Sequence, residues 1–212
     1  MHLVFIHGWG LDSSLWHEVC ARLPDVPHQR IDMGFFGEIS DEIKSNAPSI
    51  LVGHSLGFIH GITRQHNWSG WIAINSFPRF VKTTSQPGCT SATELQDMRA
   101  RLEANPKKTL QNFHKFIGAH TPQGAFNGAR LRAGLDELRE KDVSKKIAAL
   151  NVPGLVLASR NDPLVPIATS DVLAHNAQLV WHETAGHMLP QNDPVWCTTA
   201  IADFLKTNFR NQ

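Results

Sequence analysis

The chain has 212 residues, 42% of them hydrophobic and 18% charged, with a formal net charge of +1. This length suits one domain with a sizeable core and is too short for two. The composition is that of a soluble globular protein, and we expect no nucleic-acid partner. The apolar start of the chain stops at His7-Gly8, and no later stretch approaches the length of a bilayer span, so we expect neither a signal peptide nor a membrane partner.

Cysteine and histidine usage bears on compartment and cofactors. The three cysteines lie far apart without metal-type spacing, which fits a reducing compartment and predicts a cytoplasmic protein. The twelve histidines are scattered singly along the chain. The sequence therefore predicts neither a metal site nor another cofactor.

The elements up to residue 75 alternate between strand and helix. Strands are predicted over 3–6, 29–32, 50–52 and 70–75, and helices from Ser13 or Ser14 to Leu23, from Ser40 to Asn46 and over 56–66. The first strand is apolar throughout, as expected for a strand that is buried on both faces of a sheet. This order predicts a parallel sheet with helices on both faces.

The alternation stops at residue 77 and resumes near residue 151. Between these points only helices are predicted, over 93–104, 106–118 and 129–140. The later elements are a strand over 154–159, a helix over 167–175, a strand over 178–182 and a helix over 194–208. We therefore expect a single domain over 1–212, with a core formed by 1–77 and 151–212 and a helical lid over about 78–150. The lid should lie over the carboxyl edge of the sheet, where α/β proteins bind ligands.

The segment Gly53-His54-Ser55-Leu56-Gly57 carries the main chemical signal. It lies between an apolar strand and a helix, which is the context of the G-x-S-x-G nucleophile elbow. Side chains at residues 53 and 57 would collide with the neighbouring strand and helix, so both positions need glycine. Such a turn would present the hydroxyl of Ser55 at the top of the sheet; the alternative is a plain strand-to-helix turn.

A serine hydroxyl needs a general base, and the base needs a carboxylate that orients it. Asp162 lies just past the strand at 154–159, and His187 just past the strand at 178–182. Nucleophile, acid and histidine also follow one another in the chain order of G-x-S-x-G enzymes. Taken singly, the two residues could be a turn aspartate and a loop histidine. Their joint placement predicts Ser55, Asp162 and His187 as a catalytic triad.

The third requirement is an oxyanion hole made of two N–H groups. We assign one to the backbone of Leu56, directly after the serine, and the other to the backbone of Trp9 in the loop His7-Gly8-Trp9-Gly10. The indole of Trp9 is expected to wall an acyl pocket, with ordinary core packing as the alternative.

Five motifs together resemble the α/β-hydrolase superfamily. They are His7-Gly8-Trp9-Gly10, Asp32-x-Gly34-Phe35-x-Gly37, the segment around Ser55, Arg160-Asn161-Asp162-x-x-Val165-Pro166 and Gly186-His187. Within it, the sequence is most similar to the carboxylesterases that cleave pimeloyl-[acyl-carrier protein] methyl ester in biotin synthesis. The pointers are Leu11 with Leu15-Trp16, the run Asn75-Ser76-Phe77-Pro78-Arg79-Phe80, and Phe113 with Phe116. The first predicted strand begins at residue 3, so we expect the two N-terminal strands usual in this fold to be missing, and we expect a lid shortened around 118–128.

The resemblance implies a serine carboxylesterase that hydrolyses a methyl ester carried on an acidic acyl-carrier protein. Residues 78–146 hold 13 lysines and arginines and 7 acids, a net charge of +6, which would steer such a partner. The docking candidates are Arg79, Arg99, Arg101, Arg130 and Arg132; the alternative is that these charges solvate exposed helix faces. An apolar acyl site is predicted from Trp9, Phe77, Phe113, Phe116 and Met188, with plain packing as the alternative.

Other activities fit the same residues. A general short-chain esterase, a thioesterase, and a lyase or C–C hydrolase could all use this triad. A non-catalytic receptor with the hydrolase fold is a further alternative, against which the intact triad argues. The sequence predicts how a bond is cleaved more sharply than which bond is cleaved.

Overall fold

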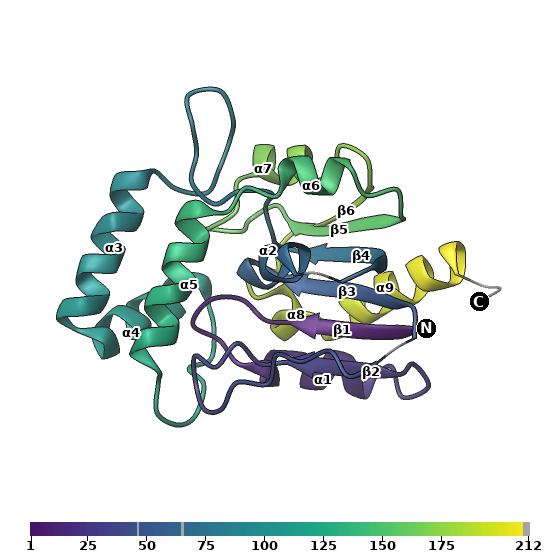
Figure 1. The fold of residues 1–212 in the computed structure, drawn as a ribbon, viewed down its shortest axis with the longest axis horizontal. Helices are drawn as coiled ribbons and strands as arrows, with labels where there is room; N and C mark the ends of the chain where they lie inside the picture. The colour runs from purple at the N-terminus through teal and green to yellow at the C-terminus, as the bar shows by residue number, and fades with distance from the viewer. Residues whose placement is uncertain (46, 65, 210–212) are drawn as a thin grey trace.

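The computed structural model describes residues 1–45, 47–64 and 66–209 (Figure 1). Six strands form one sheet in the order β2-β1-β3-β4-β5-β6, and every neighbouring pair is parallel. The strands are β1 His2–Ile6, β2 His28–Ile31, β3 Ser49–His54, β4 Trp68–Ile74, β5 Gly154–Ser159 and β6 Gln178–His182. The predicted α/β fold with a parallel sheet is confirmed.

The strand order reverses between β1 and β3. From β1 the chain first goes to β2 on one side and then crosses to β3 on the other. In an open parallel sheet such a reversal leaves a crevice at the carboxyl ends of the two strands, where ligands bind. Here that point lies between the loop that follows Ile6 and the turn that follows His54.

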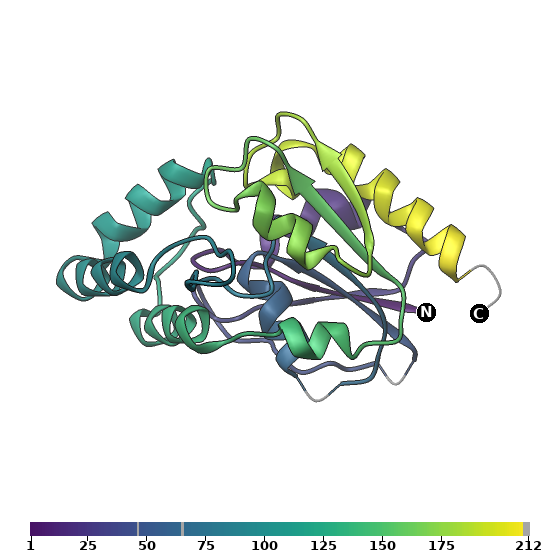
Figure 2. The ribbon, with the colours of Figure 1, turned by 90° about the horizontal axis from the view of Figure 1, so that it is seen from above.

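Helices cover both faces of the sheet. One face packs against the 3₁₀ helix η1 (Ser13–Trp16), α1 (His17–Ala21), α8 (Leu189–Asn192) and α9 (Pro194–Asn208). The other packs against α2 (Leu56–Thr63), α6 (Ser144–Ala148) and α7 (Ile167–Leu173). Figure 2 shows α9 on one side of the sheet and α2 with α6 on the other. Side chains of β1 alternate accordingly, Val4 to the second face and Phe5 to the first, and both are fully buried.

The insertion, residues 78–150, contributes α3 (Ala92–Ala104), α4 (Pro106–Ile117) and α5 (Gly128–Glu140) in addition to α6. These first three helices lie beyond the carboxyl ends of the strands (Figure 1). Local sequence sets their ends: Ser91 and Glu94 form a capping box at the start of α3. Asn105 caps α4, which ends at Gly118 in a left-handed conformation with φ of 73°.

Two predicted helices need correction. The first does not begin at a serine cap and run to Leu23: Asp12 accepts the Ser14 N–H, η1 comes next, and α1 ends at Ala21. The second, predicted from Ser40 to Asn46, is not helical over 40–45, and Asn46 lies outside the described residues. There the backbone of Ser40 pairs with that of Asp32 through hydrogen bonds of 2.9 and 3.0 Å, which extends the chain.

Smaller differences concern helix ends and short helices. The helix predicted over 56–66 ends at Thr63, and residue 65 is outside the described residues. The short helices α6 and α8 were not predicted, because four or five residues carry too little periodicity. Within the described ranges, no helix is long and apolar enough to cross a membrane.

The carboxylate of Asp32 joins the end of β2 to the segments beside it. Its Oδ2 accepts the Ser13 N–H at 2.9 Å, and its Oδ1 accepts the Gly34 N–H at 2.9 Å and lies 3.4 Å from Nε2 of His7. Burial alone would raise the pKa of Asp32. The nearby His7 ring and the two N–H groups lower the pKa by more than burial raises it, and the result is a pKa of about 2. Because the pKa falls on folding, this carboxylate stabilises the protein above about pH 4, and its contribution is lost as the pH falls toward 2.

We predict that Asp32→Asn lowers the free energy of unfolding by about 2 kcal/mol at pH 7, from a shift of about two pKa units. The difference from wild type should shrink as the pH falls from 4 toward 2. Urea unfolding at pH 7, 4 and 3 measures it, with Asp171→Asn on the exposed side of α7 as the control. An equal loss at all three pH values would show that the carboxylate charge is not the cause.

Candidate active site

Ser55 lies in a sharp turn between β3 and α2. Its backbone has φ of 52° and ψ of −125°, which side-chain-bearing residues rarely adopt and which marks functional sites. A Cβ on Gly53 would lie 2.3 Å from Cα of Phe58, and one on Gly57 would lie 2.2 Å from the carbonyl oxygen of Ile6. The predicted steric need for both glycines is confirmed. The turn also leaves Ser55 at the N-terminus of α2, the positive end of the helix dipole.

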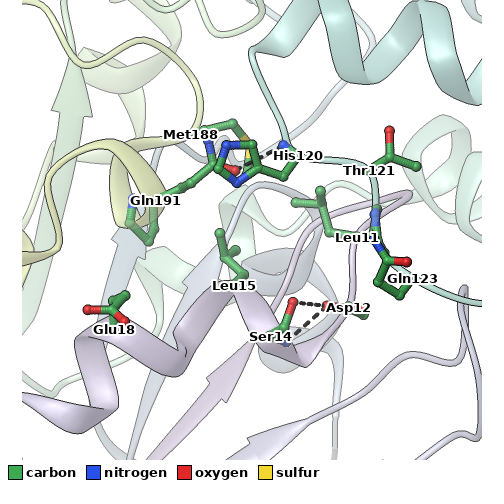
Figure 3. Close-up of a pocket in the computed structure, with 12 residues that line it drawn as sticks. Leu11, Asp12, Ser14, Leu15, Glu18, His120, Thr121, Gln123, Met188 and Gln191 are labelled. Carbon is green, nitrogen blue, oxygen red and sulfur yellow. Dashed lines mark hydrogen bonds between the residues drawn. The ribbon is translucent and has the colours of Figure 1, made fainter.

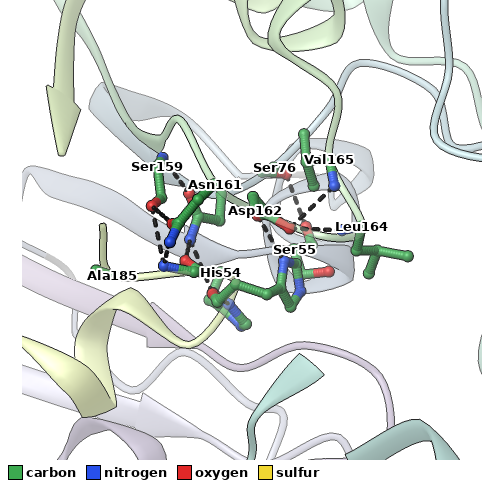
Figure 4. A network of polar contacts seen from close by, with 12 residues as sticks. His54, Ser55, Ser76, Ser159, Asn161, Asp162, Leu164, Val165 and Ala185 are labelled. Atoms are coloured by element: carbon green, nitrogen blue, oxygen red, sulfur yellow. Dashed lines mark hydrogen bonds and ion pairs between the residues drawn. The ribbon is translucent and has the colours of Figure 1, made fainter. Parts of the chain in front are cut away.

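Asp162 and His187 meet at the ends of β5 and β6. Nδ1 of His187 lies 2.8 Å from Oδ2 of Asp162, and both side chains are 1% exposed. Oδ1 of Asp162 accepts the N–H groups of Leu164 and Val165 at 2.7 and 3.0 Å (Figure 4). A carboxylate held by these N–H groups acts as acceptor, so Nδ1 of His187 carries the proton. Nε2 is then the basic nitrogen of the ring.

His187 is adjacent to the turn that holds Ser55. The centroid of its ring lies 4.8 Å from that of His54, the residue before Ser55. No hydrogen bond between described residues engages the Ser55 hydroxyl or Nε2 of His187. Within the described part of the chain, no group of three or more His, Cys, Asp or Glu side chains is arranged to bind a metal. The structure therefore gathers the three predicted triad residues at one edge of the sheet.

Polar side chains that the sequence did not single out hold the loop before His187. The Gly186 N–H lies 3.0 Å from Oγ of Ser159 and 2.8 Å from Oδ1 of Asn161. Asn161 also donates from Nδ2 to the carbonyl of Thr184 at 2.9 Å. Figure 4 shows Ser159 and Asn161 beside this loop. The available signal was a short polar residue at the end of a buried strand, Ser159, followed two residues later by Asn161, which the sequence offered only as a member of a motif.

The loop after β1 lies against Ser55. A Cβ on Gly8 would lie 3.0 Å from Cβ of Ser55, so this loop approaches the serine closely only because residue 8 is glycine. Leu56 is the first residue of α2, and its N–H therefore has no acceptor within the helix. Among the described residues the Trp9 N–H has no hydrogen-bond acceptor either.

The insertion holds this same loop in place. The indole Nε1 of Trp9 donates to the carbonyl of Leu131 in α5 at 2.9 Å, and the indole is 3% exposed. The ring of Phe113 in α4 meets the indole edge to face, with centroids 4.9 Å apart. Nε2 of His114 donates to the carbonyl of Gly10 at 2.6 Å, and burial lowers the pKa of His114. The side chain of Trp9 thus packs against α4 and α5 of the insertion.

The structure brings some of the residues predicted to bind the acyl chain together, because Phe113 contacts Trp9 and also packs against the apolar cluster that contains Met188. Phe77 is fully buried against Phe80, and Phe113 packs on Trp9. Phe116 is 54% exposed. Met188 is 1% exposed and lines a pocket of about 310 Å³.

This pocket lies beside the loop that carries His187 (Figure 3). Its walls come from the start of η1 and α1, from the segment after α4, and from α8. Leu11, Leu15 and Met188 give it an apolar part, and Asp12, Glu18 and Gln191 a polar one. Ser55, Asp162 and His187 are not among the described residues that line it. Two of its lining residues are close in sequence to the site, since Met188 directly follows His187 and Leu11 lies two residues after Trp9.

The predicted docking arginines fall into two groups. Arg79 pairs with Asp142, Arg99 pairs with Asp136, and Nε of Arg130 donates to the carbonyl of Met33 at 3.0 Å. Arg101 and Arg132 are exposed, and within residues 1–45, 47–64 and 66–209 neither forms an ion pair. Arg130 also forms no ion pair among the described residues, but it is half-buried, so Arg101 and Arg132 are the two of the five that are both exposed and unpaired.

The model of the alpha/beta hydrolase family matches residues 3–200. The biotin biosynthesis bifunctional protein BioHC of Cellvibrio japonicus is 27% identical over 97% of the chain, which spans about half of that relative (47%). The pimeloyl-[acyl-carrier protein] methyl ester esterase of Sodalis glossinidius is 27% identical over 95% of the chain and 92% of that protein. A solved esterase from Exiguobacterium antarcticum, EaEST, superposes with a TM-score of 0.83 at 16% identity, covering 97% of this chain and 92% of its own, a likeness of fold.

The contact between α5 and Trp9 generates a prediction. A Cβ on Gly134 would lie 2.7 Å from Cδ1 of Trp9 and 3.0 Å from Cε1 of Phe35, so Gly134→Ala must displace the indole. We expect overpacking to outweigh the gain in helix propensity and to lower stability by about 1 kcal/mol, measured as a lower Tm. Gly128→Ala, at the start of the same helix with only the Arg132 side chain 3.5 Å away, is the control and should be neutral. Equal behaviour of the two variants would refute the tight Trp9 contact.

Proposed function

The chain belongs to the alpha/beta hydrolase family, and from this premise we propose that it is a serine esterase that hydrolyses a carboxylic ester. The observation that carries the proposal is the 2.8 Å contact between His187 and Asp162 beside the strained turn at Ser55. A nucleophile, a base and an orienting carboxylate are the three parts that activate a serine hydroxyl.

In the proposed mechanism Ser55 attacks the ester carbonyl while Nε2 of His187 takes the hydroxyl proton. His187 then delivers this proton to the leaving alcohol, and Asp162 stabilises the imidazolium that forms in between. The N–H groups of Trp9 and Leu56 bind the oxygen that becomes negative. Water, activated by His187, releases the acid and restores Ser55.

We further propose that the substrate is the methyl ester of a pimeloyl chain on an acyl-carrier protein, within biotin synthesis. The relative from Sodalis glossinidius is a pimeloyl-[acyl-carrier protein] methyl ester esterase, which supports this substrate, and the relative from Cellvibrio japonicus is a biotin biosynthesis protein, which supports this pathway. A general short-chain esterase and a thioesterase use the same groups and are the competing activities.

A panel of methyl esters and thioesters, free and carrier-bound, tests the activity and the substrate together. We expect the carrier-bound methyl ester to have the highest kcat/KM. Asp162→Asn should lower kcat about 10⁴-fold because the imidazole loses its correct tautomer, and Ser55→Ala should lower it at least as much. Full activity in Ser55→Ala would exclude the proposed mechanism, and a preference for thioesters would exclude the proposed substrate.

The charge of the insertion supports docking of an acidic partner. Residues 78–146 carry a net charge of +6, and the exposed arginines Arg101 and Arg132 lie on α3 and α5, beyond the strand ends. Long-range attraction of this kind acts mainly on the association rate and weakens with salt. We therefore propose these two arginines as the main contributors among the predicted docking residues.

The double variant Arg101→Gln, Arg132→Gln should lower kcat/KM for the carrier-bound ester about tenfold at low salt and leave the free methyl ester unaffected. The effect should fade as the ionic strength rises toward 0.5 M. Lys206→Gln, on α9 at the opposite end of the molecule (Figure 1), serves as the control. An unchanged rate and salt dependence would rule out docking through this face.

A further inference from the structure

The carbonyl oxygen of His187 receives hydrogen bonds from two side chains that belong to other strands. Nε2 of His54, the last residue of β3, lies 3.0 Å from it, and Nδ2 of Asn75, directly after β4, lies 2.8 Å from it. His54, Asn75 and His187 are at most 1% exposed. Hydrogen bonds between buried groups are stronger than those at the surface, and their loss is correspondingly costly.

Asn75 uses its whole side chain to join three strand ends. Besides the bond to His187, Nδ2 donates to the carbonyl of Gly186 at 2.8 Å, and Oδ1 accepts the N–H of Ser159 at 2.8 Å. Its backbone is left-handed with φ of 43°, a conformation that asparagine tolerates better than most residues. Asn75 therefore links the ends of β4 and β5 to the loop that follows β6.

The ring of His54 contacts both the main chain of His187 and the loop after β1. One ring nitrogen, Nε2, donates to the His187 carbonyl, while the other, Nδ1, is buried without a partner among the described residues. A Cβ on Gly8 would lie 3.0 Å from this Nδ1, so the ring reaches the loop that carries Trp9. Burial and the neighbouring His187 lower the pKa of His54 well below its usual value, which keeps the ring neutral.

The loop at His187 needs such anchors. Gly186, directly before it, has φ of 69°, and a Cβ there would meet nothing within 4 Å, so side-chain packing does not fix the chain at this glycine. Ser159 and Asn161 hold the N–H of Gly186, but they make no hydrogen bond to the main chain of His187. Asp162 holds only one atom of the His187 ring. The direction from which the ring approaches Ser55 then depends on where the main chain of His187 is held.

We infer that Asn75 and His54 are positioning residues, which hold the main chain of His187 so that its ring meets Ser55 and Asp162 at the reactive angle. This inference rests on the proposed role of His187 as the base. A small displacement of a catalytic group lowers the rate steeply, by up to about 10²-fold for 1 Å. Both side chains are buried and contact the main chain of His187, so the effect should fall on kcat and not on KM.

Pairs of variants separate the hydrogen bond from other effects. Asn75→Gly keeps the left-handed backbone and removes the amide, and Asn75→Asp keeps the acceptor for Ser159 but removes the donor. In His54→Gln the side-chain amide can place an N–H where Nε2 of His54 lies, so the hydrogen bond to the His187 carbonyl can be kept. In His54→Asn the side chain is too short to reach this carbonyl. Ser49→Ala, at the opposite end of β3, removes the hydrogen bond of 2.9 Å that the buried Ser49 donates to the carbonyl of Ala47, and it controls for simple destabilisation.

The rates are measured on a p-nitrophenyl ester and divided by the number of sites titrated with a fluorophosphonate, so that unfolded protein does not count. We expect kcat per site to fall 10- to 100-fold in Asn75→Gly, Asn75→Asp and His54→Asn, with KM within about threefold of wild type. For His54→Gln, both kcat per site and KM should stay within about threefold of wild type.

Two outcomes overturn the inference and differ from each other. If wild type hydrolyses the ester, Ser55→Ala does not, and Asn75→Gly matches Ser49→Ala per site, then the positioning role is wrong and the esterase proposal stands. If wild type neither turns over the ester nor reacts with the fluorophosphonate, the proposed function fails, and the inference that rests on it fails with it.

Discussion

The backbone contact between α2 and the end of β1 is the constraint on which the site depends. A Cβ on Gly57 would lie 2.2 Å from the carbonyl oxygen of Ile6 and 2.5 Å from that of His7, so only glycine lets the helix approach this closely. The approach brings Ser55 against the loop after β1 and directs the N-terminus of α2 at the same space. Because all six strands are parallel, Asp162 and His187 arrive at that edge from β5 and β6. The parallel sheet and the glycine at residue 57 thus bring Ser55 to the same edge as Asp162 and His187, which lie more than a hundred residues later in the chain.

The insertion contacts the loop after β1 and helps to set the geometry of the site. Its helices α4 and α5 bind the loop after β1 through His114 and through the carbonyl that receives the indole N–H of Trp9. The N–H proposed to stabilise the oxyanion belongs to this loop, so the geometry of the site depends on the insertion as well as on the sheet. Phe113 of α4 packs against the indole of Trp9, and its role in binding an acyl chain stays a prediction.

Features carried by steric or periodic rules were predictable from the sequence. The strands at 154–159 and 178–182 agree with β5 and β6, and the need for Gly53 and Gly57 follows from the strand-turn-helix context. Features that depend on contacts between distant segments were not. The helix predicted from Ser40 is replaced by pairing with Asp32, and His54 looked like a mere member of a motif although it contacts the backbone of a residue 133 positions away. Local propensity gives no information on such partners.

The central claim is that Ser55 is the nucleophile and His187 its base. Mass spectrometry of the protein, quenched during turnover of a slowly deacylated ester, tests it most directly. The account predicts one acyl group per chain, on the peptide that contains Ser55, and far slower acylation in His187→Ala. Product formation with no acyl group on Ser55 at any time, or acylation of another residue at the rate of turnover, would contradict it.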